Sequence, residues 1–136
     1  MKTLILFYSY TGHTKKLAEE MSAKESADIA EIKDAKRPGK LKAYCSGCFN
    51  ALRGKAWPIQ PIAADLAAYD RIKICSPVWA GNLPPAVNAA LEKLPGGKTV
   101  SFTLASASGK SDCRAKIETA VKSKGCTLEG FMDVKA

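Results

Sequence analysis

The sequence predicts a single α/β domain built on a parallel sheet with helices on both faces. First, strand-like and helix-like stretches alternate along the chain, which is typical of this class. Second, the run "TLILFY" at residues 3–8 is apolar throughout rather than alternating, as a strand buried on both faces requires. Third, a length of 136 residues with 46% hydrophobic content suits one packed core, so one domain is expected over residues 1–136.

The expected elements follow in order along the chain. Strands are predicted at 3–8, 27–32, 71–76, 99–104 and 127–134. Between them, apolar residues at helical spacing predict helices at 13–24, 84–94 and 111–124, and a short helix is expected at 41–53. In the helix at 84–94, Val87, Ala90, Leu91 and Leu94 share one face, and Pro95 begins the segment that stops it.

The formal net charge is +8, from 21 Lys and Arg against 13 Asp and Glu, and much of the excess is local. Residues 33–55 hold seven basic residues and a single acid, Asp34. Such a segment is either an ordinary solvated face or a surface that attracts an acidic protein, a nucleic acid or a membrane. No pattern of stacking aromatics runs through it, so nucleic acid is not the expected partner. No apolar run reaches the length of a membrane span.

The cysteines are Cys45, Cys48, Cys75, Cys113 and Cys126. No export signal is expected, because the first apolar run is short and leads directly into hydroxyl residues. The odd number of cysteines then indicates the thiols of a cytoplasmic protein rather than a disulfide framework. The lone C-x-x-C pair at 45 and 48 is read as unreactive thiols, with a redox dithiol as the alternative. No metal site is expected, since no second such pair exists.

The segment "SYTGHT" at residues 9–14 joins the first strand to the first helix. A loop in this position exposes unpaired backbone N–H groups and the positive end of the helix dipole, which attract an anion. Gly12 permits a tight turn, and Ser9, Thr11 and Thr14 add hydroxyl donors. The loop is therefore either a phosphate site or a hydroxyl-rich helix cap.

The spacing of glycines excludes two common phosphate-binding motifs. Gly97-Lys98-Thr99 lacks the earlier glycine of a Walker A loop, because Glu92 stands in its place. No three glycines have the dinucleotide spacing G-x-G-x-x-G. No lysine lies within the 9–14 loop, which argues against binding of a nucleoside triphosphate. A ligand with a single terminal phosphate fits the loop better.

"SYTGHT" resembles the phosphate loop of flavodoxins, whose pattern is Thr/Ser-x-Thr-Gly-x-Thr. "SPVWAGNLPPAV" at 76–87 resembles that family's second loop, which passes the flavin ring. "FNALRGK" at 49–55 and "DLAAYDRI" at 65–72 are similar to a small single-domain branch of flavodoxin-like proteins. The resemblance covers nearly the whole chain. It implies a three-layer αβα sandwich with a five-stranded parallel sheet of order 2-1-3-4-5, and FMN bound where the strand order reverses.

The resemblance also implies which residues contact FMN. Residues 9–14 would hold the phosphate, and Trp79 is the best candidate to stack on the flavin ring, although it can also be read as a half-buried core residue. The expected FMN-binding residues are Ser9, Tyr10, Thr11, Gly12, His13, Thr14, Pro77, Val78, Trp79, Ala80, Gly81, Asn82, Ala105, Ser106, Ala107, Ser108 and Gly109. No paired carboxylates or Ser/His/Asp set is present, so no catalytic residue is expected.

Two departures from the flavodoxin pattern bear on function. Residues 105–110 contain no aromatic residue to cover the second face of the ring, and the chain is basic where flavodoxins are acidic. The resemblance implies an FMN-binding electron carrier, and a redox partner of acidic character is expected to dock near Lys33 to Lys55. Two alternatives stay open: an NAD(P)H-dependent FMN-containing reductase of quinones or flavins, and a flavin-free module that binds another phosphate ligand.

Overall fold

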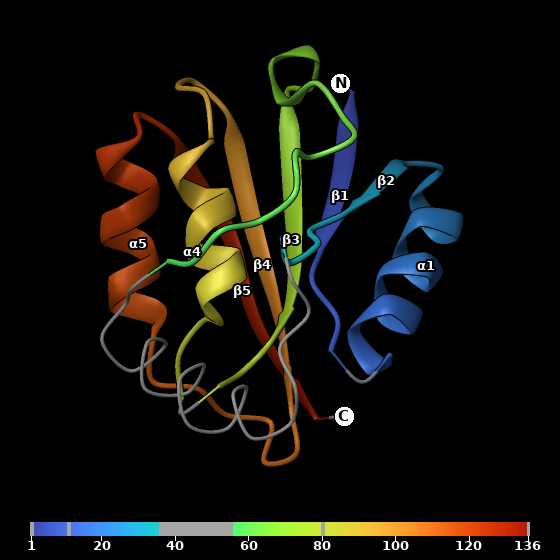
Figure 1. Ribbon diagram of the computed structural model, residues 1–136, viewed down its shortest axis with the longest axis vertical. Helices are drawn as coiled ribbons and strands as arrows, with labels where there is room; N and C mark the ends of the chain where they lie inside the picture. The colour runs from blue at the N-terminus through green and yellow to red at the C-terminus, as the bar shows by residue number, and fades with distance from the viewer. Residues whose placement is uncertain (1, 11, 36–55, 80, 136) are drawn as a thin grey trace.

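The computed structural model describes residues 2–10, 12–35, 56–79 and 81–135 (Figure 1). Its strands are β1 (Thr3–Phe7), β2 (Asp28–Glu31), β3 (Arg71–Pro77), β4 (Thr99–Ser106) and β5 (Thr127–Lys135). Its α-helices are α1 (His13–Glu25), α4 (Pro85–Glu92) and α5 (Arg114–Ser123), and a 3₁₀ turn, η2, spans Leu66–Ala68. The helix expected at 41–53 lies outside the described residues, as do Cys45 and Cys48.

All five strands belong to one parallel sheet of order β2-β1-β3-β4-β5, which confirms the predicted strand order. The first strand lies inside the sheet, where Leu4 pairs with Asp28 on one side and with Ile72 on the other. A strand with neighbours on both edges and helices on both faces is removed from water, which explains the continuous apolar run in β1.

The two faces of the sheet hold two separate apolar clusters. α4 and α5 pack on one face, and α1 lies on the other (Figure 1). Successive residues of β1 divide between them, since Leu4 and Leu6 join the α4 and α5 side while Ile5 and Phe7 join Ala18 of α1. The predicted layer of helices on each side of the sheet is thus confirmed.

β4 differs from β1 because its two faces are chemically distinct. Val100, Phe102 and Leu104 are buried beneath α4 and α5, whereas Ser101 and Thr103 are half-exposed on the opposite face. Side-chain burial thus alternates with a period of two residues, as expected for a strand with one buried face and one solvent-exposed face. The apolar core therefore continues to the β5 edge on one side of the sheet only.

An open groove of about 790 Å³ follows from this asymmetry. Among the described helices, only α1 lies on that face, and it packs against β1, β2 and β3. The groove runs from Met21 of α1 across the sheet to Met132 of β5, whose side chain is 58% exposed. On its floor Lys73 pairs with Glu25 of α1, so charge as well as apolar surface lies along it.

The predicted elements differ from the observed ones at their ends. The helix expected from residue 111 begins at Arg114, and the N–H of Asp112, which precedes it, donates to the Gly81 carbonyl. The strand expected at 99–104 continues to Ser106, where it still pairs with β5. The 3₁₀ turn η2 was not predicted; Asp65 caps it by accepting a hydrogen bond from the Ala67 N–H at 3.1 Å.

Candidate cofactor site

The loops that leave β1, β3 and β4 meet at the carboxyl edge of the sheet, the lower edge in Figure 1. The strand order reverses here, because β2 and β3 lie on opposite sides of β1. In open α/β sheets ligands bind at such a switch point. The structure therefore brings the three predicted loops to one place, although they are far apart in the sequence.

The first loop is closed by its own side chain. Ser9 Oγ accepts a hydrogen bond from the Gly12 N–H at 2.9 Å, and the Gly12 carbonyl accepts the first bond of α1 from the Lys16 N–H at 3.1 Å. Gly12 has φ 102°, a left-handed conformation that side chains rarely adopt. His13 begins α1 on the surface, and Thr14 is 2% exposed beneath the loop. Thr11 lies outside the described residues.

The space in front of Gly12 is suited to a small anion. A Cβ built on Gly12 would meet no protein atom within 4 Å, so the glycine is needed for its backbone angle and not to relieve crowding. This open space lies at the N-terminus of α1, where the helix dipole is positive, and α1 has no acidic residue in its first turn. The residues present thus fit a phosphate group.

The second loop forms a narrow turn, which we call the Trp79–Asn82 turn. Its first and last residues exchange two backbone hydrogen bonds: Trp79 N–H to Asn82 O at 2.8 Å and Asn82 N–H to Trp79 O at 2.9 Å. Gly81 within the turn has φ 78°. Ala80 lies outside the described residues. Two residues before the turn, Pro77 ends β3 beside Ala105.

Four aromatic rings meet around this turn, and we call them the aromatic cluster. Trp79 packs edge-to-face against Tyr8, Tyr10 and Trp57, each with its ring centroid 5.9 Å away. Such contacts stabilise each aromatic pair by about 0.5–1.5 kcal/mol beyond surface burial. Trp79 is half-buried and packs against the core, so part of its side chain remains exposed.

One carboxylate ties the aromatic cluster to the end of β2. Asp34 accepts a hydrogen bond from the Tyr8 hydroxyl at 2.7 Å and another from the Trp57 indole N–H at 2.8 Å. Its backbone also pairs with Ile59. The two bonds satisfy the polar ends of both rings, which lets them pack beside the site without an unpaired donor.

The third loop is a compact turn at the end of β4. Ser106 Oγ accepts from the Lys110 N–H at 3.1 Å and donates to the Lys110 carbonyl at 3.2 Å. Ala107 and Ser108 project from it and are exposed. The turn therefore presents small side chains, as expected from a segment, residues 105–110, that contains no aromatic residue.

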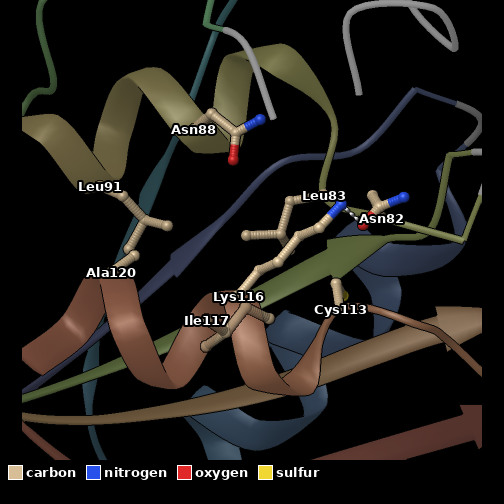
Figure 2. A pocket seen from close by; sticks show the side chains of 8 residues that line it. All are labelled: Asn82, Leu83, Asn88, Leu91, Cys113, Lys116, Ile117 and Ala120. Carbon is tan, nitrogen blue, oxygen red and sulfur yellow. Dashed lines mark hydrogen bonds between the residues drawn. The ribbon is translucent and has the colours of Figure 1, made fainter. Parts of the chain in front are cut away.

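Behind the Trp79–Asn82 turn, α4 and α5 border a pocket of about 130 Å³ (Figure 2). Asn82, which is 5% exposed, faces α5 here, and its side-chain oxygen accepts a hydrogen bond from Lys116 Nζ at 3.2 Å. Asn88 of α4 points into the same space (Figure 2). Burial raises the pKa of the Cys113 thiol in the pocket wall, which keeps it protonated near neutral pH.

The described members of the predicted set thus come from three neighbouring loops, but they do not all face the site in the same way. Ser9, Tyr10, Gly12 and the Trp79–Asn82 turn gather at the switch point. Asn82 is turned toward α5, and Ala105 is buried within β4. No group of three or more His, Cys, Asp or Glu side chains in the described ranges is placed to hold a metal.

Sequence reasoning missed Tyr8, Asp34 and Trp57. The sequence pattern predicts Tyr8 only as the end of the first strand, although a tyrosine at the end of a buried strand needs a partner for its hydroxyl. The requirement of the Tyr8 hydroxyl for a hydrogen-bond partner is the feature of the sequence that indicates a role for Tyr8 beside the site. Asp34 and Trp57 join the site through contacts distant in sequence, which residue spacing does not reveal.

No protein-family model and no curated protein matches the chain. Solved structures do. A flavoprotein from Lactobacillus acidophilus NCFM, crystallised in complex with FMN, is 26% identical with a TM-score of 0.77, over 96% of this chain and 91% of that one. Oxidised flavodoxin 2 from Bacillus cereus is 18% identical with a TM-score of 0.61, over 99% of this chain and 84% of that one.

A flavodoxin from Streptococcus pneumoniae TIGR4 is 15% identical with a TM-score of 0.57, over 100% of this chain and 87% of that one. These similarities agree with the observed strand order and with the place of the three loops. The resemblance to flavodoxin-like proteins is therefore confirmed, and the chain has the flavodoxin-like fold over nearly its whole length.

Proposed function

We propose that this chain binds FMN at the switch point and serves as an electron carrier. The observation that supports this most directly is the first loop, in which a left-handed glycine with open space before it lies at the N-terminus of α1. The 26% identical flavoprotein that is crystallised with FMN adds to this support.

In this proposal each loop has its own task. Ser9, Gly12 and Thr14, with Thr11 and the backbone N–H groups of residues 10 and 13, hold the phosphate. The Trp79–Asn82 turn and residues 106–109 line the flavin ring. Bound FMN would supply the group that accepts and donates electrons, while the protein supplies binding, orientation and exclusion of water.

Titration of the purified protein with FMN tests the binding. We expect quenching of flavin fluorescence and a shifted visible spectrum with one FMN per chain. Riboflavin, which lacks the phosphate, should bind more weakly. Unquenched FMN fluorescence would overturn the flavin proposal and favour the flavin-free phosphate module.

The carrier role is tested by how the flavin is reduced. The chain has no dinucleotide fingerprint, so reduction by NADH or NADPH alone should be slow. Reduction by a separate acidic reductase should be faster and should slow as salt rises. The Debye length is about 10 Å at 0.1 M salt, so added salt weakens the attraction between exposed charges on the two proteins. Of the expected docking segment, Lys33 is described and exposed, and the other basic residues lie outside the described part of the chain.

The reductase alternative has one observation in its favour, the small exposed side chains of Ala107 and Ser108 beside the proposed ring. Steady NAD(P)H oxidation with a small quinone, insensitive to salt, would make the protein an enzyme.

Charge reversal at Lys40 and Lys42 should slow reduction by the acidic protein without changing FMN affinity. Unchanged rates in that variant would move the docking surface elsewhere.

A further inference from the structure

The Trp79–Asn82 turn is held from outside the three loops. Its two backbone hydrogen bonds close the turn but do not fix its position relative to the sheet. On one side, Tyr8 and Trp57 pack against Trp79. On the other side the contacts come from Asp112, just before α5, and from Lys116 within α5.

Asp112 holds the middle of the turn. Its backbone N–H donates to the Gly81 carbonyl at 2.7 Å. Its carboxylate lies against the same residue, since a Cβ built on Gly81 would be 2.8 Å from Asp112 Oδ2. The turn therefore packs directly on this segment, and no side chain larger than that of glycine fits at Gly81 without a shift.

Lys116 holds the end of the turn. Its ammonium donates to the side-chain oxygen of Asn82 at 3.2 Å, across the pocket between α4 and α5 (Figure 2). The acceptor end of this bond is buried, because Asn82 is 5% exposed. A charged donor on a shielded acceptor makes a stronger bond than one on the open surface.

We propose that Asp112 and Lys116 are positioning residues that fix the Trp79–Asn82 turn in its flavin-binding arrangement. The effect on flavin affinity rests on the proposed function, whereas the effect on the turn itself does not. A turn that is already in place avoids the ordering cost that a mobile one meets on binding. Lys116 acts on the turn through its bond to Asn82 and not through the phosphate loop, so its replacement should affect FMN and riboflavin to the same extent.

The experiment compares Lys116→Met with Lys116→Arg, which keeps a donor, and with Lys122→Met, a matched control at an exposed lysine of the same helix. Two quantities are measured: amide hydrogen exchange of residues 79–82 in the flavin-free protein, and the dissociation constants for FMN and riboflavin. In Lys116→Met we expect exchange about threefold to tenfold faster and both dissociation constants raised about threefold to tenfold. Lys116→Arg and Lys122→Met should resemble the wild type in both quantities.

Asp112 is tested in the same way. Asp112→Ala keeps the backbone N–H bond to Gly81 and removes only the carboxylate, so it should loosen the turn less than Lys116→Met does. Gly81→Ala should weaken flavin binding more than Lys116→Met or Asp112→Ala. Adding Asp112→Ala to Gly81→Ala should restore part of the lost affinity, because it removes the carboxylate that the new methyl group would meet.

Unchanged exchange at residues 79–82 in Lys116→Met would overturn the inference, whatever happens to affinity. Faster exchange with unchanged affinity would overturn it as well. If the wild type binds no FMN, the proposed function fails, and the exchange measurement still decides whether Lys116 holds the turn.

Discussion

Thr14 shows how one residue can belong to both the core and the candidate site. It is the second residue of α1 and is 2% exposed, directly behind the loop that carries Gly12. In the proposed site, a hydroxyl shielded from water in this way would bind the FMN phosphate with little competition from solvent.

Thr14→Ala should therefore raise the FMN dissociation constant about tenfold, because losing a hydrogen bond to a charged group costs about 1.5–3 kcal/mol. Thr14→Ser keeps the hydroxyl and should lose much less. Thr119→Ala, at an exposed threonine of α5, is the matched control and should change nothing. Equal losses in Thr14→Ser and Thr14→Ala would show that the methyl group matters rather than the hydroxyl.

Cys75 gives the molecule a defined response to alkaline pH. Burial raises the pKa of this thiol to about 12, whereas in the unfolded chain it ionises near 9. The folded protein therefore keeps a proton that the unfolded chain loses. The contribution to stability is fully present below pH 9 and is lost as the pH rises from 9 toward 12.

Relative to Cys75→Ala, the wild type should lose about 1 kcal/mol of unfolding free energy between pH 8 and pH 10. Urea unfolding of both proteins across that range measures the difference, in which ionisations common to both cancel. Parallel pH profiles for the two proteins would show that the Cys75 thiol ionises equally in both states.

At the scale of elements, α1 ends in an unusual way. Its C-cap is Ser26 with φ 51° and ψ 40°, the left-handed region that glycine usually occupies at this position. The Ser26 N–H still donates to the Ser22 carbonyl, and Ser22 Oγ donates to Ala27 O at 2.6 Å. These bonds hold a serine in a conformation that costs it about 1 kcal/mol.

Ser26→Gly should consequently raise the free energy of unfolding by about 0.5–1 kcal/mol, measured by urea denaturation. Ser123→Gly makes the same substitution at a helical residue of α5 and should lower stability by a similar amount. FMN affinity should not change in either variant. A destabilised Ser26→Gly would mean that the serine side chain contributes more than its backbone strain costs.

The elements themselves could be predicted from the sequence, and their ends could not. Apolar runs and helical spacing are local patterns, so they identified all five strands and the helices α1, α4 and α5. The hydrogen bond between Asp112 and Gly81, just before α5, joins residues distant in sequence, which local patterns do not reveal. The first loop could be predicted from its residue types, and the second from its resemblance to the flavodoxin loop. The contacts of Asp34, Trp57 and Lys116 could not, because they also join residues distant in sequence.

At the scale of the whole molecule, the sheet has one face covered along its width and one face whose β4 and β5 portion is half-exposed. Phe102 and Met132 lie on these opposite faces, with exposed fractions of 1% and 58%. Phe102→Ala should lower the free energy of unfolding by about 3–5 kcal/mol, because it leaves a cavity between β4 and the helices.

Met132→Ala should change the unfolding free energy by less than about 0.5 kcal/mol. Urea denaturation of both variants checks the contrast. A large loss in Met132→Ala would mean that this face is covered in solution. Concentration-dependent stability would then identify a second copy of the chain as the cover.

The position of β1 inside the sheet also sets the order in which the protein can be completed during synthesis. Thr3 pairs with Arg71, so β1 cannot form its pair with β3 until β3 has also been made. Non-local parallel pairing of this kind folds slowly and leaves apolar strands open to aggregation. During that interval the segment Leu4–Tyr8, which is buried in the folded protein, exposes apolar side chains to which a chaperone could bind.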